Sequence, residues 1–170
     1  MILLAFEVFT VFLTAVTTSL ALAHALEYPG KLRLDEQTYT AVQAIYYPGF
    51  TIGGIAEPVA ALAVLVLLVI MRDRNAQLPW LLSAFIALLA MHVVFWSVTQ
   101  PVNRYWLKDQ KLSEAGAKFF DTEHTNAPDR SGTGITDWRS FRNRWEYSHM
   151  VRAFLSAIAF IAITVVIATR

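Results

Sequence analysis

The sequence predicts an all-α integral membrane protein in which four spanning helices form one antiparallel, up-down-up-down bundle. Apolar residues make up 56% of the 170 residues and charged residues only 16%, whereas soluble domains average about 45–50% and about 25%. Four mainly apolar segments each reach the roughly 20 residues that a helix needs to cross a bilayer. Short or moderate connections between consecutive segments make neighbouring helices antiparallel.

The first spanning helix is expected over about residues 2–26. The turn that contains Pro29 should end it, because proline lacks the N–H group and clashes with the preceding helical turn. A polar connection over about residues 29–50 follows, and the second spanning helix occupies about residues 52–71. Gly53 in its opening turn permits close approach of a neighbouring helix.

A short hairpin at residues 72–77 leads into the third spanning helix, about residues 78–98, which should end before Pro101. The longest connection covers about residues 103–140 and carries most of the charge, and the fourth helix covers about residues 142–169. Nothing indicates an internal repeat or a second domain. The whole chain, residues 1–170, is therefore predicted to be a single membrane domain with both long connections on one side.

Composition excludes several classes of function. The chain has no cysteine, which excludes disulfides, thiolate metal sites, iron–sulfur clusters and dithiol reductases. A net charge of +1, without a dense basic cluster, gives no argument for nucleic-acid binding. The expected partners are membrane lipid, an apolar small molecule, and a second copy of the chain or a larger membrane complex. Lysine and arginine are more frequent on the side of the long connections, which predicts that this side is cytoplasmic.

Ionisable residues inside the spanning segments indicate a functional site. Each costs roughly 2.5–3.5 kcal/mol to insert, so such residues usually face the interior of a bundle. They gather near the end that carries the long connections, with one of them, His92, about two turns deeper. The seven are His24 and Glu27 in the first helix, Glu57 in the second, His92 in the third, and Glu146, His149 and Arg152 in the fourth.

The spacing of these residues places nitrogen and carboxylate ligands on shared helix faces. His24 with Glu27, and Glu146 with His149, are each three residues apart, so each pair lies on one face of its helix. On the first helix this face continues through a stripe of further polar residues, which should point into the bundle. The stripe consists of Glu7, Thr10, Thr14 and Thr17.

A transition-metal site is one interpretation of this pattern. A Glu-x-x-His pair with a further Glu and His from neighbouring helices is typical of carboxylate-bridged metal sites in helical bundles. Imidazole and carboxylate suit iron, copper, manganese or zinc. The predicted ligands of one or two metal ions are His24, Glu27, Glu57, His92, Glu146 and His149.

The alternative to a metal site is structural. The carboxylates would then form ion pairs at the membrane interface, and the histidines would make hydrogen bonds between helices. Arg152 is the hardest residue to explain in that way, because it lies two turns inside the fourth helix and requires a buried anion. Glu57, Glu27 or the enolate of a substrate could supply that anion.

Three stretches of the chain resemble one family. Together they are similar to the anthrone oxygenase-like family of small four-helix membrane proteins, and the similarity spans nearly the whole chain. The stretches are His24-Ala-Leu-Glu27-Tyr-Pro-Gly-Lys31-Leu-Arg33, Thr99-Gln-Pro-Val-Asn103-Arg104 and Arg144-Trp145-Glu146-Tyr-Ser-His149-Met-Val-Arg152.

The resemblance implies an oxygenase-like activity, because fungal members are implicated in oxidising anthrones to anthraquinones with molecular oxygen. It also implies a location in a bacterial inner membrane. Anthrone oxidation has been described without a cofactor, so the resemblance does not require the metal. On the matching positions it implies a site of His24, Glu27, Asn103, Trp145, Glu146, His149 and Arg152.

The leading hypothesis is a membrane oxidoreductase for an apolar, aromatic small molecule. His149, with Glu146 one turn away, is the predicted general base, since the pKa of an imidazole lies near working pH. Arg152 and Asn103 would stabilise the charge of the enolate. Two other hypotheses remain open: a non-catalytic subunit of a larger membrane complex, and a haem-binding protein in which His24 or His92 lies opposite His149.

Overall fold

The computed structural model describes residues 1–107, 111–120 and 138–169. Within those ranges all regular structure is helical, and no strand occurs. Four helices are long and apolar enough to cross a membrane, which confirms the predicted all-helical class and fits an integral membrane protein. They are Ile2–Lys31, Gly49–Ile70, Leu78–Leu107 and Trp138–Ala168.

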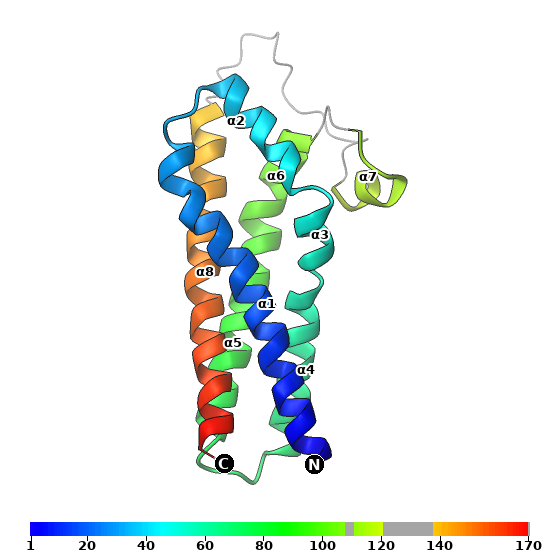
Figure 1. The fold of residues 1–170 in the computed structure, drawn as a ribbon, viewed down its shortest axis with the longest axis vertical. Helices are drawn as coiled ribbons and strands as arrows, with labels where there is room; N and C mark the ends of the chain where they lie inside the picture. The colour runs from blue at the N-terminus through cyan, green and yellow to red at the C-terminus, as the bar shows by residue number, and fades with distance from the viewer. Residues whose placement is uncertain (108–110, 121–137, 170) are drawn as a thin grey trace.

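The four long helices lie side by side (Figure 1). Helix α1 (Ile2–Lys31) and helix α5 (Leu78–Val94) each pack against both α8 (Trp138–Ala168) and α4 (Ala56–Ile70). Both chain termini lie at one end of the molecule, together with the connection between α4 and α5, and helix α2 lies at the other end (Figure 1). This second end is called the α2 end below.

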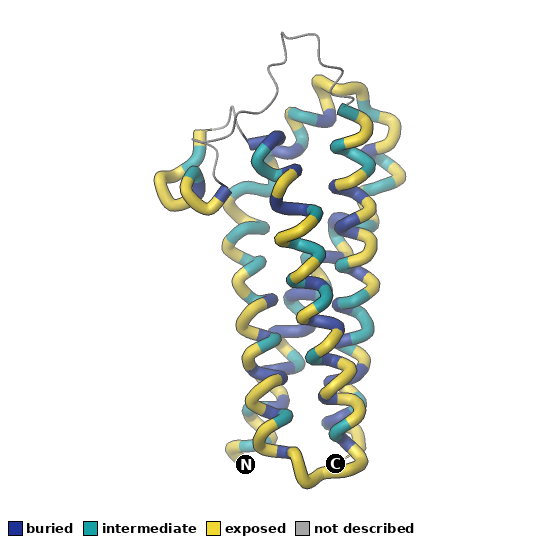
Figure 2. The backbone as a smooth tube through the Cα atoms, turned by 180° about the vertical axis from the view of Figure 1, so that it is seen from behind, coloured by how far each residue is buried: buried dark blue, intermediate teal, exposed yellow. Residues whose placement is uncertain are grey.

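The core and the surface of the helices are both apolar, as expected for a chain whose solvent is lipid. Large side chains such as Leu67, Leu81 and Ile163 are fully buried between the helices. The outward faces are also apolar along most of their length, and burial alternates with exposure along every helix (Figure 2). Examples from each of the four helices are Phe12, Leu62, Ile86 and Phe154, all about 60% exposed or more.

The polar stripe of the first helix faces the interior, as predicted. Glu7 and Thr10 are fully buried, and Thr14 and Thr17 are nearly so. The hydroxyls of Thr10 and Thr14 donate to carbonyls of the preceding turn, for example Thr10 Oγ1 to Phe6 O at 2.8 Å. These bonds satisfy the hydroxyls where water is absent.

The predicted end of the first helix is wrong. Helix α1 continues through Pro29 to Lys31. Proline removes one backbone hydrogen bond, to the carbonyl four residues earlier, and the turn beyond it closes because Leu32 N donates to Tyr28 O at 3.1 Å. The extra turn places Lys31 at the α2 end of the helices, near Glu27 and Glu146.

The connection expected over residues 29–50 is largely helical. Helix α2 (Glu36–Gln43) leads into a 3₁₀ turn, η1 (Ala44–Tyr46), and a short helix α3 (Gly49–Gly53) precedes α4. Asp35 caps α2 by accepting a hydrogen bond from Thr38 N at 2.8 Å. That bond stabilises the carboxylate and lowers the pKa of Asp35.

The third spanning helix also runs beyond its predicted end. After α5 a π-helical turn, η2 (Phe95–Thr99), leads into α6 (Gln100–Leu107). Pro101 cannot donate to the carbonyl of Ser97 four residues earlier. Arg144 Nη2 donates to that carbonyl instead, at 3.2 Å. The helix therefore passes the proline without an unsatisfied carbonyl and carries its polar residues across the α2 end.

The connection predicted over residues 103–140 is described only in part. Its start belongs to α6, and a short helix α7 (Glu114–Phe120) contains its middle. Residues 108–110 and 121–137 lie outside the described residues.

Gly53 is where α3 touches α1. A Cβ atom at Gly53 would lie 2.8 Å from Leu20 Cδ1, whereas a Cβ atom at Gly49 would meet nothing within 4 Å. Glycine at this position therefore lets α3 close against α1, as the sequence predicts.

We expect Gly53→Ala to destabilise the protein relative to Gly49→Ala by about 1–3 kcal/mol, the usual cost of overpacking. Both substitutions remove backbone freedom from the unfolded chain, so their difference isolates the contact with Leu20. The free energy of unfolding in mixed detergent micelles measures it. Equal stability of the two variants would show that α3 does not press on α1 at this point.

Candidate functional site

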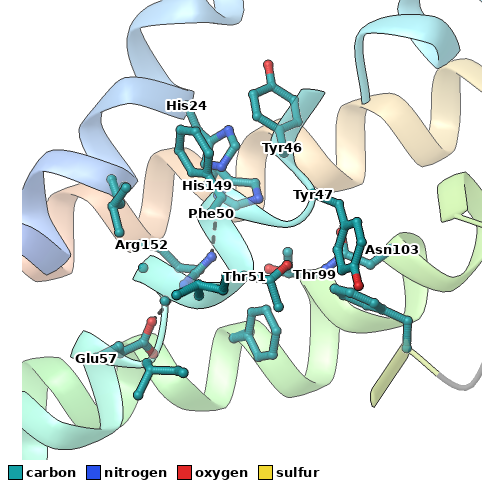
Figure 3. Close-up of a pocket in the computed structure, with 18 of the residues that line it drawn as sticks. His24, Tyr46, Tyr47, Phe50, Thr51, Glu57, Thr99, Asn103, His149 and Arg152 are labelled. Atoms are coloured by element: carbon teal, nitrogen blue, oxygen red, sulfur yellow. Dashed lines mark hydrogen bonds and ion pairs between the residues drawn. The ribbon is translucent and has the colours of Figure 1, made fainter. Parts of the chain in front are cut away.

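A cavity of about 390 Å³ lies between the spanning helices near the α2 end. Figure 3 shows the side chains that surround it. Its walls are mainly apolar and aromatic, and they come from α1, α3, α4, α5, η2, α6, α7 and α8. A mostly apolar cavity of this size with a few converging polar groups is typical of small-molecule sites. The polar and ionisable groups include His24, Tyr46, Glu57, His92, Thr99, Asn103, His149 and Arg152.

Two imidazoles meet at the wall of this cavity. The ring centroids of His24 on α1 and His149 on α8 are 4.2 Å apart, and both residues are buried. Aromatic rings enclose the pair: the centroid of Phe50 lies 4.4 Å from that of His24, and the centroid of Trp145 lies 4.1 Å from that of His149. Tyr46 contacts His24 edge-on at 4.6 Å. The structure thus joins two histidines that the sequence placed at one membrane depth.

Glu57 is the buried anion that Arg152 requires. Arg152 Nη2 donates to Glu57 Oε2 at 2.7 Å, and both side chains are about nine-tenths buried. The other oxygen of the carboxylate, Oε1, lies 3.2 Å from His92 Nδ1. Figure 3 shows Arg152 between Glu57 and His149. Helices α4, α5 and α8 are therefore tied together by charged groups at the cavity wall.

The contact between Arg152 and His149 fixes the tautomer of the imidazole. Arg152 Nη1 lies 3.4 Å from His149 Nδ1. Because a guanidinium group only donates hydrogen bonds, Nδ1 must be the acceptor. The ring proton of His149 is therefore on Nε2. In this state His149 offers the cavity an N–H donor.

The Nδ1 atom of His24 lies near an acidic side chain, whereas that of His149 lies near a basic one. His24 Nδ1 is buried and has no hydrogen bond within the described residues, and it lies 3.9 Å from Glu27 Oε2. A carboxylate on that side favours the proton on Nδ1, which leaves Nε2 with a free lone pair. The two adjacent imidazoles thus have different neighbours at Nδ1: Arg152 for His149 and Glu27 for His24.

A second polar cluster covers the α2 end of the histidine pair, and Lys31 is its centre. Lys31 Nζ lies 2.9 Å from Glu27 Oε2 and 3.8 Å from Glu146 Oε1. It also lies over the rings of Tyr46 and Trp145, 4.6 Å and 4.7 Å from their centroids. Sequence reasoning gave Lys31 no role because it placed this residue beyond the first helix. Its position four residues after Glu27 was the signal that could have identified it.

Two tyrosines complete this cluster. Tyr39 Oη donates to Glu146 Oε1 at 2.8 Å, and Tyr46 Oη donates to Glu27 Oε2 at 2.5 Å. Burial raises the pKa of both phenols, so both stay protonated and remain donors. Glu146 is engaged here and does not line the cavity. The sequence-based pairing of Glu146 with His149 at the reacting centre is therefore not what the geometry favours.

Asn103 lines the cavity but is already committed to a neighbour. Its Oδ1 accepts from Trp145 Nε1 at 2.8 Å, and its Nδ2 donates to Gln100 Oε1 at 3.4 Å. This pairing orients Trp145, which forms a wall beside both histidines. Tyr46 and Phe50 were missed by sequence reasoning, since they lie in a segment expected to be a polar connection.

The predicted metal ligands do not converge. Among the described residues, no three His, Cys, Asp or Glu side chains are placed to hold a metal ion. The physical reason is that the predicted ligands other than His24 already have polar partners. Glu57 binds Arg152, and Glu27 and Glu146 bind Lys31 and the tyrosines. The six-residue set of His24, Glu27, Glu57, His92, Glu146 and His149 is therefore not supported as a metal site.

The haem hypothesis meets a similar obstacle. The rings of His24 and His149 contact each other, so a porphyrin cannot lie between them. His92 uses both nitrogens, because Nδ1 contacts Glu57 and Nε2 accepts from Trp96 Nε1 at 2.9 Å. It has no lone pair left for an iron ion.

Comparison with known protein families shows to which family the chain belongs. The model of the anthrone oxygenase family matches residues 43–162. The chain belongs to the anthrone oxygenase family. The match includes Glu57, His92, His149 and Arg152, and it begins after His24. No curated protein and no solved structure gave a match.

In this anthrone oxygenase family member, we expect Arg152→Met to lower the free energy of unfolding by about 3–5 kcal/mol, because it leaves the buried Glu57 carboxylate without its cation. The double variant Arg152→Met, Glu57→Gln should recover most of that loss, since no buried charge is left unpaired. Unfolding in mixed micelles measures both values.

The control for this experiment is Arg72→Met, since the side chain of Arg72 is 76% exposed. We expect that variant to stay within about 0.5 kcal/mol of the parent. If the double variant were as unstable as Arg152→Met alone, the loss of stability would not come from an unpaired Glu57 carboxylate, and the prediction would be wrong.

Proposed function

We propose that this protein is a membrane oxygenase that converts an activated methylene group of an apolar, aromatic substrate into a ketone with molecular oxygen. One observation carries the proposal: two adjacent buried imidazoles face an apolar cavity beside a buried arginine. Membership of the anthrone oxygenase family supports the class of reaction. An anthrone, whose methylene is acidified by a ketone across the ring, is the substrate type that fits best.

The cavity suits such a substrate in shape and polarity. Phe50, Phe95 and Trp145 offer ring faces and edges to a planar guest, and aromatic contacts of this kind favour stacked or edge-on geometry. The cavity lies among helices long enough to span a bilayer. A molecule dissolved in the membrane lipid could therefore reach it without crossing water.

We further propose how the protein sits in the membrane. The helices would form an antiparallel, up-down-up-down bundle in a bacterial inner membrane, with the α2 end in the cytoplasm. The higher frequency of lysine and arginine in the two long connections supports this orientation.

The first chemical step removes a proton from the methylene carbon. We assign this step to His24, because Nδ1 faces Glu27 and the lone pair of Nε2 is left for the substrate. Sequence reasoning assigned the base to His149, but Arg152 occupies the Nδ1 lone pair of that ring. A positioned imidazole is a common general base for proton abstraction.

The enolate that forms needs hydrogen-bond donors at its oxygen. His149 Nε2–H, on the ring next to His24, and the guanidinium group of Arg152, which contacts His149, are donors that could serve this purpose. They are held in place before the reaction by Glu57 and by the packing of the rings. Donors that are fixed in advance in a dry cavity stabilise developing charge much more than water does.

Oxygen then reacts with the carbanion, and the atoms balance without another reductant. The carbon–oxygen bond forms, and the proton held by His24 returns to the distal oxygen to give a hydroperoxide. Loss of the second C–H proton breaks the O–O bond and releases water. The overall change is CH₂ plus O₂ to C=O plus H₂O, in which the methylene loses four electrons and oxygen gains four. No step requires a metal ion.

Substitution to glutamine distinguishes the roles of the two histidines, because a glutamine amide donates a hydrogen bond but is not a base. We expect His24→Gln to reduce oxygen uptake with an anthrone by about 10²–10⁴-fold. His149→Gln should retain activity within about tenfold, whereas His149→Ala, which has no donor, should lose about 10²–10³-fold. A Clark electrode in detergent solution, with anthraquinone quantified by chromatography, measures the rates.

Two controls complete this test. Ser83→Ala alters an exposed hydroxyl on α5 that bonds only its own helix, and it should react like the parent. Dialysis of the parent against a chelator should leave the rate unchanged. Full activity in His24→Gln would contradict the assignment of the base, and loss of the rate on chelation would contradict the metal-free route.

A further inference from the structure

A line of hydrogen bonds runs from the outer surface of the helices to Arg152. Trp96 Nε1 donates to His92 Nε2 at 2.9 Å, and His92 Nδ1 lies 3.2 Å from Glu57 Oε1. Glu57 Oε2 accepts from Arg152 Nη2 at 2.7 Å. The line begins at Trp96, which is 48% exposed, and ends in the buried interior. It joins three spanning helices.

The donors at the two ends leave a single arrangement of protons along this line. The indole of Trp96 can only donate, so Nε2 of His92 must carry the lone pair. Nδ1 of His92 therefore carries the proton and donates it to Glu57. The Glu57 carboxylate favours the same tautomer, and the indole N–H adds the second hydrogen bond that fixes the orientation of the ring.

The π-helical turn η2 (Phe95–Thr99) builds this arrangement. It places the ring of Phe95 under the guanidinium of Arg152, with Cζ 5.1 Å from the ring centroid, and it carries Trp96 beside His92. Single π turns inside α-helices often occur at functional sites. Phe95 thus contacts Arg152 directly, and the next residue, Trp96, is linked to Arg152 through His92 and Glu57.

We propose that Trp96 and His92 are positioning residues for Arg152, holding the Glu57 carboxylate in one orientation so that the guanidinium stays within reach of His149 Nδ1. This inference rests on the proposed function only for its effect on turnover. Loss of the Trp96 N–H would free Glu57 to rotate, draw Arg152 away from His149 and release the His149 tautomer.

A purely structural role makes a different prediction. In that case Trp96 satisfies a polar nitrogen of His92 that is partly exposed to lipid, and its loss would lower stability without affecting His149. Trp96 also contacts Phe95, with ring centroids 5.3 Å apart, and Phe95 lies under Arg152. A substitution that keeps the ring at position 96 and removes only its N–H preserves that contact, so the tautomer of His149 distinguishes the two roles.

The experiment measures histidine tautomers by NMR in the full-length chain in detergent, with ¹⁵N-labelled histidine. The chain contains four histidines, so single substitutions assign the signals. In the parent we expect the Nδ1–H tautomer at His92 and the Nε2–H tautomer at His149. Trp96→Phe keeps the ring and removes the donor, so it should shift the Nε2 signal of His92 and change the tautomer of His149. Trp80→Phe is the matched control on α5, since Trp80 is 42% exposed and does not line the cavity; it should change neither.

Turnover provides the second readout. We expect Trp96→Phe to lower kcat by about tenfold with KM unchanged, as is typical when a partner that orients a functional group is lost. His92→Gln should preserve both kcat and the His149 tautomer, because its amide accepts from Trp96 and donates to Glu57. His92→Leu should lose both, which tests the proposal even where Trp96→Phe does not fold.

The outcomes separate the two proposals. A His149 tautomer that is unchanged in both Trp96→Phe and His92→Leu would overturn the positioning role, whatever the activity. If the parent oxidises no anthrone but the tautomers change as expected, the positioning role stands and the proposed reaction fails.

Discussion

The arrangement of the site depends on one ion pair in the middle of an apolar protein. Arg152 and Glu57 meet at 2.7 Å, with both side chains about nine-tenths buried. Neither charge is tolerable alone at this depth, since each loses its hydration and the membrane offers no replacement. The pair therefore requires α4 and α8 to face each other, and it directs one edge of the guanidinium at His149.

A second group of charges acts at the α2 end, and its chemistry differs from that of the first. Lys31 is held between aromatic rings and two carboxylates, which are in turn bound by tyrosines from the segment that links α1 to α4. The segment is thereby fastened over the cavity. The two adjacent histidines lie between the two groups of charges, one beside Arg152 and the other beside Glu27. Each group thus faces Nδ1 of one ring.

The sequence was sufficient for the class of fold and for the histidine and charged residues that line the cavity, but not for Lys31, Tyr46 and Phe50. Hydropathy identifies spanning segments because a bilayer requires length and apolar composition, and the buried stripe of Glu7 and Thr10 follows from helical periodicity. The helix ends were harder. Pro29 and Pro101 each remove one hydrogen bond, and whether a helix continues depends on partners elsewhere, such as Arg144 for the carbonyl of Ser97.

The predicted metal site is not supported by the described residues, for a similar reason. Spacing along a helix shows that Glu146 and His149 share a face, but not which groups from other helices reach them. Glu146 is bound by Tyr39, a residue in a segment that hydropathy describes only as polar. His92 is turned toward Glu57 and Trp96. Tertiary partners thus convert a set of residues with the composition of a metal site into ion pairs, with two imidazoles left at the cavity.

The central claim is that the protein removes a proton from an apolar carbon acid before oxygen takes part, and an absorbance spectrum taken without oxygen tests it most directly. An anthrone added to the purified protein under argon should develop the long-wavelength band of its enolate at a pH where the free anthrone stays neutral. Aeration should then replace that band with the spectrum of the anthraquinone. A spectrum that stays that of the neutral anthrone at saturating protein, although the compound binds, would contradict the account.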